Sequence, residues 1–152
     1  MIGEKGAKMI TGIEFSKKLL LVYNSMCKSL CRELKLPQTS LDILLFLANN
    51  PEYKTARDIV EIRNIKANLV SVNVDKLVQE GYLMRRTIAG DRRKTELICT
   101  EKADPVIEKG RLVQQQFAEK LFEDISEEER TAFFGTMQTI ERNLTTYLKG
   151  QN

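Results

Sequence analysis

The stretch GYLMRRTIAGDRRKTELICTEKA, residues 81–103, constrains the fold of this chain more than any other part of its sequence. Two short runs rich in β-branched or aromatic residues, 82–87 and 95–100, flank a loop that contains Gly90, and this pattern predicts a β-hairpin. Five cations and one anion, Asp91, lie between residues 85 and 94: the cations are Arg85, Arg86, Arg92, Arg93 and Lys94. The hairpin is therefore expected to carry a strongly basic tip.

Two helices are predicted at the start of the chain. Apolar residues spaced by three and four over 12–35 indicate a long amphipathic helix, which Pro37 ends. Thr39 or Ser40 is expected to cap a second helix, TSLDILLFLANN, which stops at residues 49–51.

Two further helices precede the hairpin directly. Thr55, with Asp58 three residues later, is typical of a capping box and opens a third helix. After a short turn around Asn64, a fourth helix is predicted from residue 66 to residue 80, with Gly81 as its C-terminal stop. The third and fourth helices form a helix-turn-helix, and the hairpin follows it as a wing.

Two helices are predicted after the hairpin. The first starts at Thr100 or, alternatively, is capped by Asp104 with a proline at its first helical position, and it runs to about Asp124. A capping box of Ser126 and Glu129 opens the last helix. The expected fold class is mainly α with a small β hairpin (α+β), with long helices flanking a winged helix-turn-helix domain.

The length and composition bound the class of protein. A chain of 152 residues that is 42% hydrophobic and 30% charged suits one globular domain. It has no histidine, and we find no phosphate loop, metal-ligand constellation or nucleophile–base pair, so no enzyme and no cofactor is expected. No signal peptide or membrane-length apolar run is recognised, which makes the cytoplasm the expected location and a membrane no expected partner.

The fourth helix is expected to present a polar face for binding. A helical wheel buries four apolar residues, Val70, Val74, Leu77 and Val78. Asn68, Leu69 and Val72 then face outward, and Ser71 and Asn73 flank the buried stripe. Amide, hydroxyl and small apolar groups near a helix N-terminus can contact base edges in the major groove of DNA, and arginines on a wing can enter the minor groove. Asp91 is expected to pair with a neighbouring arginine and fix the loop.

Two other interpretations stay open at this point. The five cations can be a solvated charged surface, or the winged helix can be a protein–protein interaction module whose wing meets an acidic partner and has no DNA target. A steep salt dependence of DNA binding would separate these alternatives from DNA recognition.

The stretches VDKLVQEGYLMRR (74–86) and AGDRRKTELICTEKA (89–103) resemble the MarR family of bacterial winged helix-turn-helix transcriptional regulators. The residues that fit the family pattern are Leu77, Gly81, Arg85, Asp91, Arg93, Thr100 and Ala103. The resemblance implies a single protomer over 1–152 that forms a homodimer through helices 9–36 and 105–149, with a DNA-binding lobe over 39–103. It also implies regulation of transcription, as a repressor released by a small-molecule or oxidative signal.

The resemblance places the double-stranded DNA contacts on the fourth helix and the wing. The residues expected there are Lys66, Asn68, Leu69, Ser71, Val72, Asn73, Arg85, Asp91, Arg92, Arg93 and Lys94. Many family members have a hydroxyl residue in place of Leu69 and an arginine in place of Val72. These apolar replacements favour contacts with thymine methyl groups, so we expect a pseudo-palindromic, AT-rich operator.

Weaker expectations concern effectors and thiols. Relatives bind aromatic or phenolic molecules between the dimer helices and the DNA-binding lobe, where Tyr23, Met26 and Phe46 are candidate contacts or ordinary core residues. Cys27 and Cys31, one helical turn apart, are either an oxidant sensor or small core side chains. Cys99, where the family usually has leucine, is expected in the core.

Overall fold

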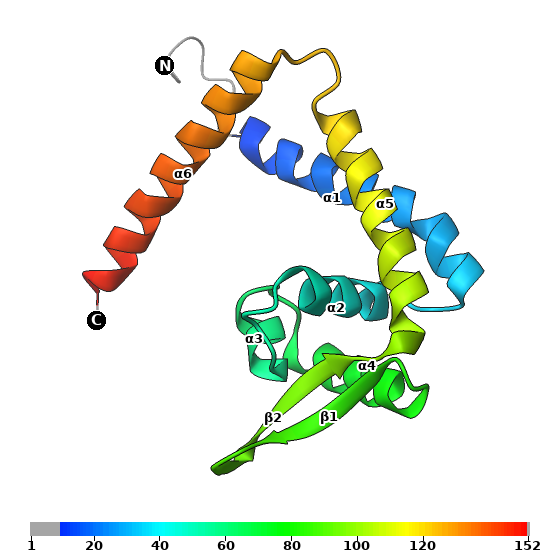
Figure 1. Ribbon diagram of the computed structural model, residues 1–152. Helices are drawn as coiled ribbons and strands as arrows, with labels where there is room; N and C mark the ends of the chain where they lie inside the picture. The colour runs from blue at the N-terminus through cyan, green and yellow to red at the C-terminus, as the bar shows by residue number, and fades with distance from the viewer. Residues whose placement is uncertain (1–9, 152) are drawn as a thin grey trace. The chain divides into compact units, whose positions relative to one another are not determined.

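The computed structural model describes residues 10–151, with the main chain alone at residues 10, 11 and 92. The predicted start of the first helix at residue 9 lies outside the described residues. The α-helices and strands follow the predicted order (Figure 1). A short 3-10 helix, η1, is added after the hairpin. They are α1 (Ile10–Leu34), α2 (Gln38–Asn49), α3 (Ala56–Glu61), α4 (Ala67–Gln79), β1 (Leu83–Ile88), β2 (Asp91–Cys99), η1 (Glu101–Ala103), α5 (Asp104–Leu121) and α6 (Glu127–Lys149).

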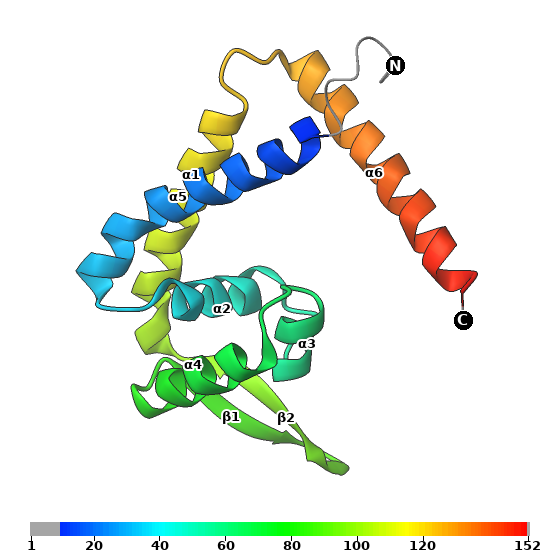
Figure 2. The same cartoon turned by 180° about the vertical axis from the view of Figure 1, so that it is seen from behind.

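The chain divides into two compact units, residues 1–117 and residues 118–152. In the first unit α2 packs against α1 and α4, α3 packs against α4, and the hairpin packs against α2 and α4. In Figures 1 and 2 the hairpin projects from this group of helices. None of the described helices is long and apolar enough to cross a lipid bilayer.

The core of the first unit is centred on α2. Seven of its twelve residues are buried, including Leu41, Ile43 and Leu44, which have no exposed surface. They meet Val70 and Leu77 from the predicted inner stripe of α4. Burial of apolar side chains is the main force that stabilises such a lobe, so α2 sets the position of the elements that surround it.

Local signals fixed several boundaries as expected. Thr55 and Asp58 form the predicted capping box of α3, and Ser126 and Glu129 form that of α6. Gly81 ends α4 with a φ of 85°, a left-handed conformation that glycine adopts without steric cost.

The predicted cap of the second helix was wrong. The helix begins at Gln38, directly after Pro37, and neither Thr39 nor Ser40 caps it. Pro37 has φ −60° and extended ψ, and its carbonyl accepts the first hydrogen bond of the helix, from the amide of Leu41. Ser40 is buried inside the first turn, where its hydroxyl makes a tertiary contact.

The second hairpin strand is longer than predicted, the first is shifted by one residue at the predicted length, and the fifth helix is shorter. The strands reach Ile88 and Asp91, so a two-residue turn, Ala89–Gly90, joins them, and Gly90 has a φ of 88°. The fifth helix ends at Leu121, and Asp124 has a left-handed φ of 60° in the turn before α6.

Candidate nucleic-acid interface

The N-terminal half of α4 presents an exposed mixed surface. Asn68 and Ser71 are exposed, as is Lys66 just before the helix. Leu69 is 43% exposed and Val72 is 66% exposed, although both are apolar. On the inner face Val70, Val74 and Leu77 are buried and Val78 is half-buried, so the predicted division of α4 into two faces is confirmed.

Asn73 lies in the core, whereas the other predicted contacts of α4 lie on its outer face. It is 7% exposed. Its amide oxygen accepts a hydrogen bond from the Ser40 hydroxyl (2.8 Å), and its amide nitrogen donates one to the Leu69 carbonyl (2.8 Å). With both ends of its side chain engaged, Asn73 ties α4 to α2 and is not available to a base edge in this arrangement.

Two of the five hairpin cations are held by acidic side chains. Arg85 on β1 pairs with Asp75 on the exposed face of α4. Arg86 pairs with Glu96 across the hairpin at 2.7 Å, and this contact holds the pKa of Glu96 below its ordinary value. The first pair masks a negative charge that would otherwise repel a phosphate backbone near α4.

The remaining cations lie where the strand pairing is irregular. Thr87 pairs with Thr95 and Ile88 pairs with Asp91, so residues 92–94 have no partner in the register and form a bulge in β2. Arg93 and Lys94 are exposed, and neither has an ion-pair partner among the residues that the structure describes. The Arg92 side chain lies outside the described residues. The bulge thus concentrates uncompensated positive charge at the tip.

Asp91 stabilises this bulge through the main chain. Its carboxylate accepts a hydrogen bond from the backbone amide of Arg93 at 3.0 Å. Such a turn, in which an aspartate accepts from an amide two residues on, fixes local backbone geometry. This contact supports the role predicted for Asp91 in fixing the loop. The partner differs from the prediction, because it is a backbone amide and not an arginine side chain.

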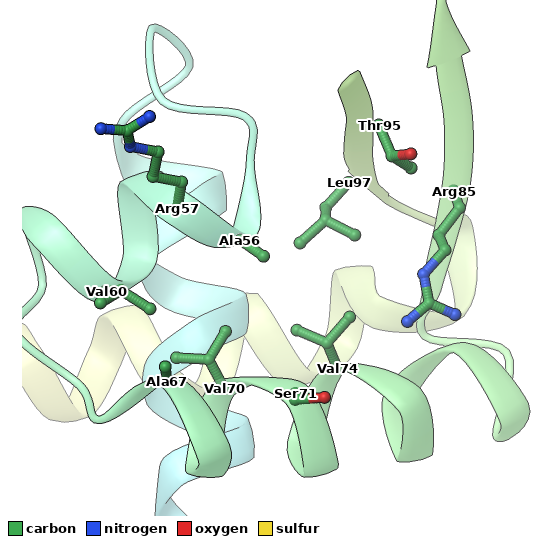
Figure 3. A pocket seen from close by; sticks show the side chains of 10 residues that line it. All are labelled: Ala56, Arg57, Val60, Ala67, Val70, Ser71, Val74, Arg85, Thr95 and Leu97. Carbon is green, nitrogen blue, oxygen red and sulfur yellow. The ribbon is translucent and has the colours of Figure 1, made fainter. Parts of the chain in front are cut away.

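A hollow of about 270 Å³ lies between α3, α4 and the hairpin. Figure 3 shows Ser71 on α4 and Arg85 on β1 at its edge, with Arg57 on α3. Arg57 was not among the predicted contacts. It pairs with Glu61 on the exposed side of α3. Its position two residues after the Thr55 cap would have marked it as an exposed cation on the helix that precedes α4.

A second cavity in the first unit, of about 110 Å³, brings together two of the three predicted effector contacts. Tyr23 from α1 and Phe46 from α2 both line it, whereas Met26 is half-buried and is not among the lining residues. Asp42 and Arg63 also line it, and sequence patterns alone had not singled them out.

The three cysteines are free thiols in apolar surroundings. Cys27 is fully buried and Cys31 is half-buried, and burial raises the pKa of both thiols. Burial, with a smaller effect of Asp104, raises the pKa of Cys99 to about 11. A raised pKa reduces the thiolate fraction at neutral pH, which disfavours reaction with oxidants. Among the described residues, no three side chains group as metal ligands.

The fold and this surface define a winged helix-turn-helix protein. The model of the MarR family matches residues 34–94, from the end of α1 to the wing tip. Over this part, which includes the helix-turn-helix and most of the wing, the chain is similar to the MarR family.

Solved structures show the same fold over nearly the whole chain. A MarR transcriptional regulator from Methanosarcina mazei Go1 is 18% identical, with a TM-score of 0.74 over 92% of this chain and 99% of that chain. A MarR family regulator from Listeria monocytogenes, complexed with a 26mer DNA, is 16% identical, with a TM-score of 0.73 over 97% of each chain. Bordetella bronchiseptica BpsR, whose DNA binding is regulated by 6-hydroxynicotinic acid, is 16% identical, with a TM-score of 0.67 over 86% of this chain and 98% of that chain.

Proposed function

We propose that this chain is a sequence-specific DNA-binding regulator of transcription that acts as a homodimer. The observation that carries the proposal is the pairing, in one lobe, of an exposed α4 N-terminus with a wing bulge whose Arg93 and Lys94 are uncompensated. An exposed helix of this kind suits the major groove, and free arginines suit the narrow minor groove. The Listeria relative in complex with DNA supports the same assignment.

The proposed division of labour follows from what each group can contact. Phosphates or the minor groove are bound by Lys66 and by the three cations of the β2 bulge, Arg92, Arg93 and Lys94. Phosphate contacts supply affinity and position the protein, whereas base contacts give specificity. On α4, Asn68 and Ser71 supply hydrogen-bonding groups for base edges, and Asn73 holds the helix in place.

The operator is proposed to be AT-rich. Leu69 and Val72 are the exposed large apolar residues of α4, and they can pack on thymine methyl groups but cannot donate to guanine. Selection of bound duplexes from a random pool tests this. A pseudo-palindromic, AT-rich consensus is expected, and a GC-rich consensus would contradict the role given to these two side chains.

Dimerisation is proposed through the flanking helices. In α6 five of the exposed large hydrophobic residues follow one stripe, Phe133, Met137, Ile140, Leu144 and Leu148, and α1 exposes Leu20 and Leu21. A contiguous exposed apolar stripe on a helix is typical of a protein interface. Sedimentation at micromolar concentration should find a dimer, and a monomer there would refute the proposal.

The regulator is proposed to be a repressor that competes with the transcription machinery and is released by a small molecule in the Tyr23–Phe46 cavity. A ligand shifts such an equilibrium only by binding one state of the protein more tightly than the other. The regulation of BpsR by 6-hydroxynicotinic acid supports a small-molecule signal. The raised pKa values of Cys27 and Cys31 argue against an oxidative one. Mass spectrometry after mild peroxide treatment should find both thiols unmodified.

A further inference from the structure

The contact between α2 and α4 contains one buried polar pair. Ser40 on α2 has no exposed surface and Asn73 on α4 is 7% exposed, and they are the two buried polar residues among those that the structure describes. The Ser40 hydroxyl donates to the Asn73 amide oxygen at 2.8 Å. The Asn73 amide nitrogen donates to the carbonyl of Leu69, one helical turn earlier, also at 2.8 Å. A chain of hydrogen bonds therefore runs from the core to the backbone of a residue on the outer face of α4.

Only one orientation of the Asn73 amide satisfies both of its neighbours. A carbonyl oxygen accepts and cannot donate, so the NH₂ group must face Leu69 and the amide oxygen must face Ser40. The amide is thereby fixed relative to the backbone of α4, with its oxygen directed at α2. Because α2 buries seven of its twelve residues, it provides a firmly held reference for the position of α4.

The other contacts of the inner face of α4 carry no such direction. Val70, Val74 and Leu77 join the apolar core, and apolar burial depends on area and not on direction. These side chains therefore oppose separation of the helices more than a small rotation of α4 about its axis. At a radius of about 5–6 Å, a rotation of about 10° moves an outer side chain by about 1 Å. A displacement of this size takes a hydrogen bond to a base edge out of its normal range.

We propose that the Ser40–Asn73 pair determines operator specificity by setting the rotation of α4 about its own axis. The rotation decides which base edges meet Asn68, Leu69 and Ser71, so Asn73 is a positioning residue and touches no base. A buried polar pair can select one arrangement of a core in this way, because an unpaired partner in any other arrangement is costly. The proposal rests on the proposed function, within which it names the origin of discrimination.

A double variant, Ser40→Ala with Asn73→Leu, removes the pair and leaves apolar groups in its place. Replacing both partners of a buried hydrogen bond by apolar groups is nearly neutral for stability, so the double variant should stay folded. If leucine proves too large for the site, Ser40→Ala alone carries the test. The control is Leu77→Ala, which removes a fully buried side chain from the same helix and keeps both hydrogen bonds. Urea unfolding should show a lower midpoint for Leu77→Ala than for the double variant.

The first measurement is discrimination between two duplexes. Fluorescence anisotropy gives the affinity for a duplex that wild type selects from a random pool and for a shuffled duplex of the same composition. In the double variant the ratio of the two affinities should fall at least about tenfold, the equivalent of one base contact. Affinity for the shuffled duplex and its salt slope should match wild type, because the wing is unchanged. A wild-type ratio in the double variant would overturn the proposal, and so would an equal loss in Leu77→Ala.

The second measurement uses the full chain without DNA. Residual dipolar couplings give the orientation of α4 relative to α2. In the double variant the couplings of α4 should no longer fit the wild-type orientation, whereas those of Leu77→Ala should fit it. Couplings that fit the wild-type orientation in the double variant would overturn the proposal, because Asn73 would then not position the helix.

The two measurements separate this proposal from the proposed function. A wild-type protein that binds no duplex above the non-specific level refutes the proposed function, and the couplings alone then decide whether the pair orients α4. A protein that binds its selected duplex with the same discrimination in wild type and in the double variant refutes the role of the pair and leaves the proposed function standing.

Discussion

The two units of this molecule use the same kind of amphipathic helix with opposite outcomes. In the first unit α2 buries seven of twelve residues, whereas α6, in the second unit, buries none of its 23. Both helices carry apolar side chains, but those of α2 meet partners within the chain and those of α6 remain exposed. The first unit therefore has a core of its own, and we expect the apolar stripe of α6 to need a second copy of the chain.

The largest expected effect is the loss of stability caused by a substitution in the core of the first unit. Leu44→Ala removes a fully buried side chain and should lower the free energy of unfolding by about 2–5 kcal/mol. Leu144→Ala, at a site 61% exposed in the protomer, should cost less than about 0.5 kcal/mol where the protomers are separated. Urea unfolding at two protein concentrations measures both. A loss for Leu144→Ala as large as that for Leu44→Ala, at every concentration, would contradict the comparison.

The next largest expected effect is a pH dependence of stability that arises from Asp42 in the first unit. Burial raises the pKa of Asp42 from 3.8 to about 6, although Arg63 and a hydrogen bond with Tyr23 oppose the rise. The folded protein thus binds this proton more tightly than the unfolded chain does. The bound proton therefore adds to the free energy of unfolding. This contribution is full below about pH 4 and is lost as the pH rises through about 6.

The Asp42→Asn variant isolates this contribution because it cannot ionise at position 42. Its stability relative to wild type should increase between about pH 4 and pH 7, by up to about 3 kcal/mol. Urea unfolding of both proteins across this range measures the change, and the difference between them cancels the effects of all other titrating groups. A difference that does not vary with pH would show that Asp42 ionises as freely in the fold as in the unfolded chain.

Two helical glycines, one in each unit, compare how closely the helices of the two units are packed. A Cβ added at Gly110 on α5 would lie 2.7 Å from a methyl carbon of Leu45, which is itself buried on α2. Gly110→Ala should therefore cost about 1–3 kcal/mol by overpacking. At Gly135 on α6 nothing lies within 4 Å, so Gly135→Ala should stabilise that helix by about 0.5–1 kcal/mol. Thermal melts test both, and a destabilising Gly135→Ala would indicate close packing against the partner.

The smallest effects come from two capping boxes, one in each unit. Thr55→Ala and Ser126→Ala each remove a side-chain acceptor for an amide at a helix start, at a cost of about 1 kcal/mol. Because α3 contacts α4 in the core unit, the loss at Thr55 should lower global stability. The loss at Ser126 should appear as faster amide hydrogen exchange in the first turn of α6. Faster exchange throughout the core for Ser126→Ala would contradict this separation.

Local sequence signals predicted the fold well. The order of the elements, both capping boxes, the Gly81 stop and the buried stripe of α4 were confirmed, because each depends on residues within a turn or two of one another. The start of α2 was predicted incorrectly because the Ser40 hydroxyl serves a partner 33 residues away. A contact of that range leaves no mark in local periodicity.

The candidate interface was predictable in composition but less so in detail. The clustered cations and the outward Leu69 and Val72 could be read from spacing. The burial of Asn73 could not, because it flanks the apolar stripe and its partner lies on another helix. The bulge at residues 92–94 depends on the strand register, which the sequence alone does not specify. The burial of Asp42 Oδ1 without a hydrogen-bond partner among the described residues likewise results from tertiary packing.

The most direct test of the central claim is the salt dependence of DNA binding. Fluorescence anisotropy with a duplex from the gene's own upstream region, over ~50–200 mM salt, compares wild type with Arg93→Ala and Lys149→Ala. Both variants lose one positive charge, but Lys149 lies at the end of α6. We predict a steep slope for wild type and Lys149→Ala, and for Arg93→Ala a weaker affinity with a slope shallower by about 0.9 for each phosphate that the variant no longer neutralises. Equal behaviour of the two variants, or no binding above the non-specific level by wild type, would contradict the proposed role of the wing.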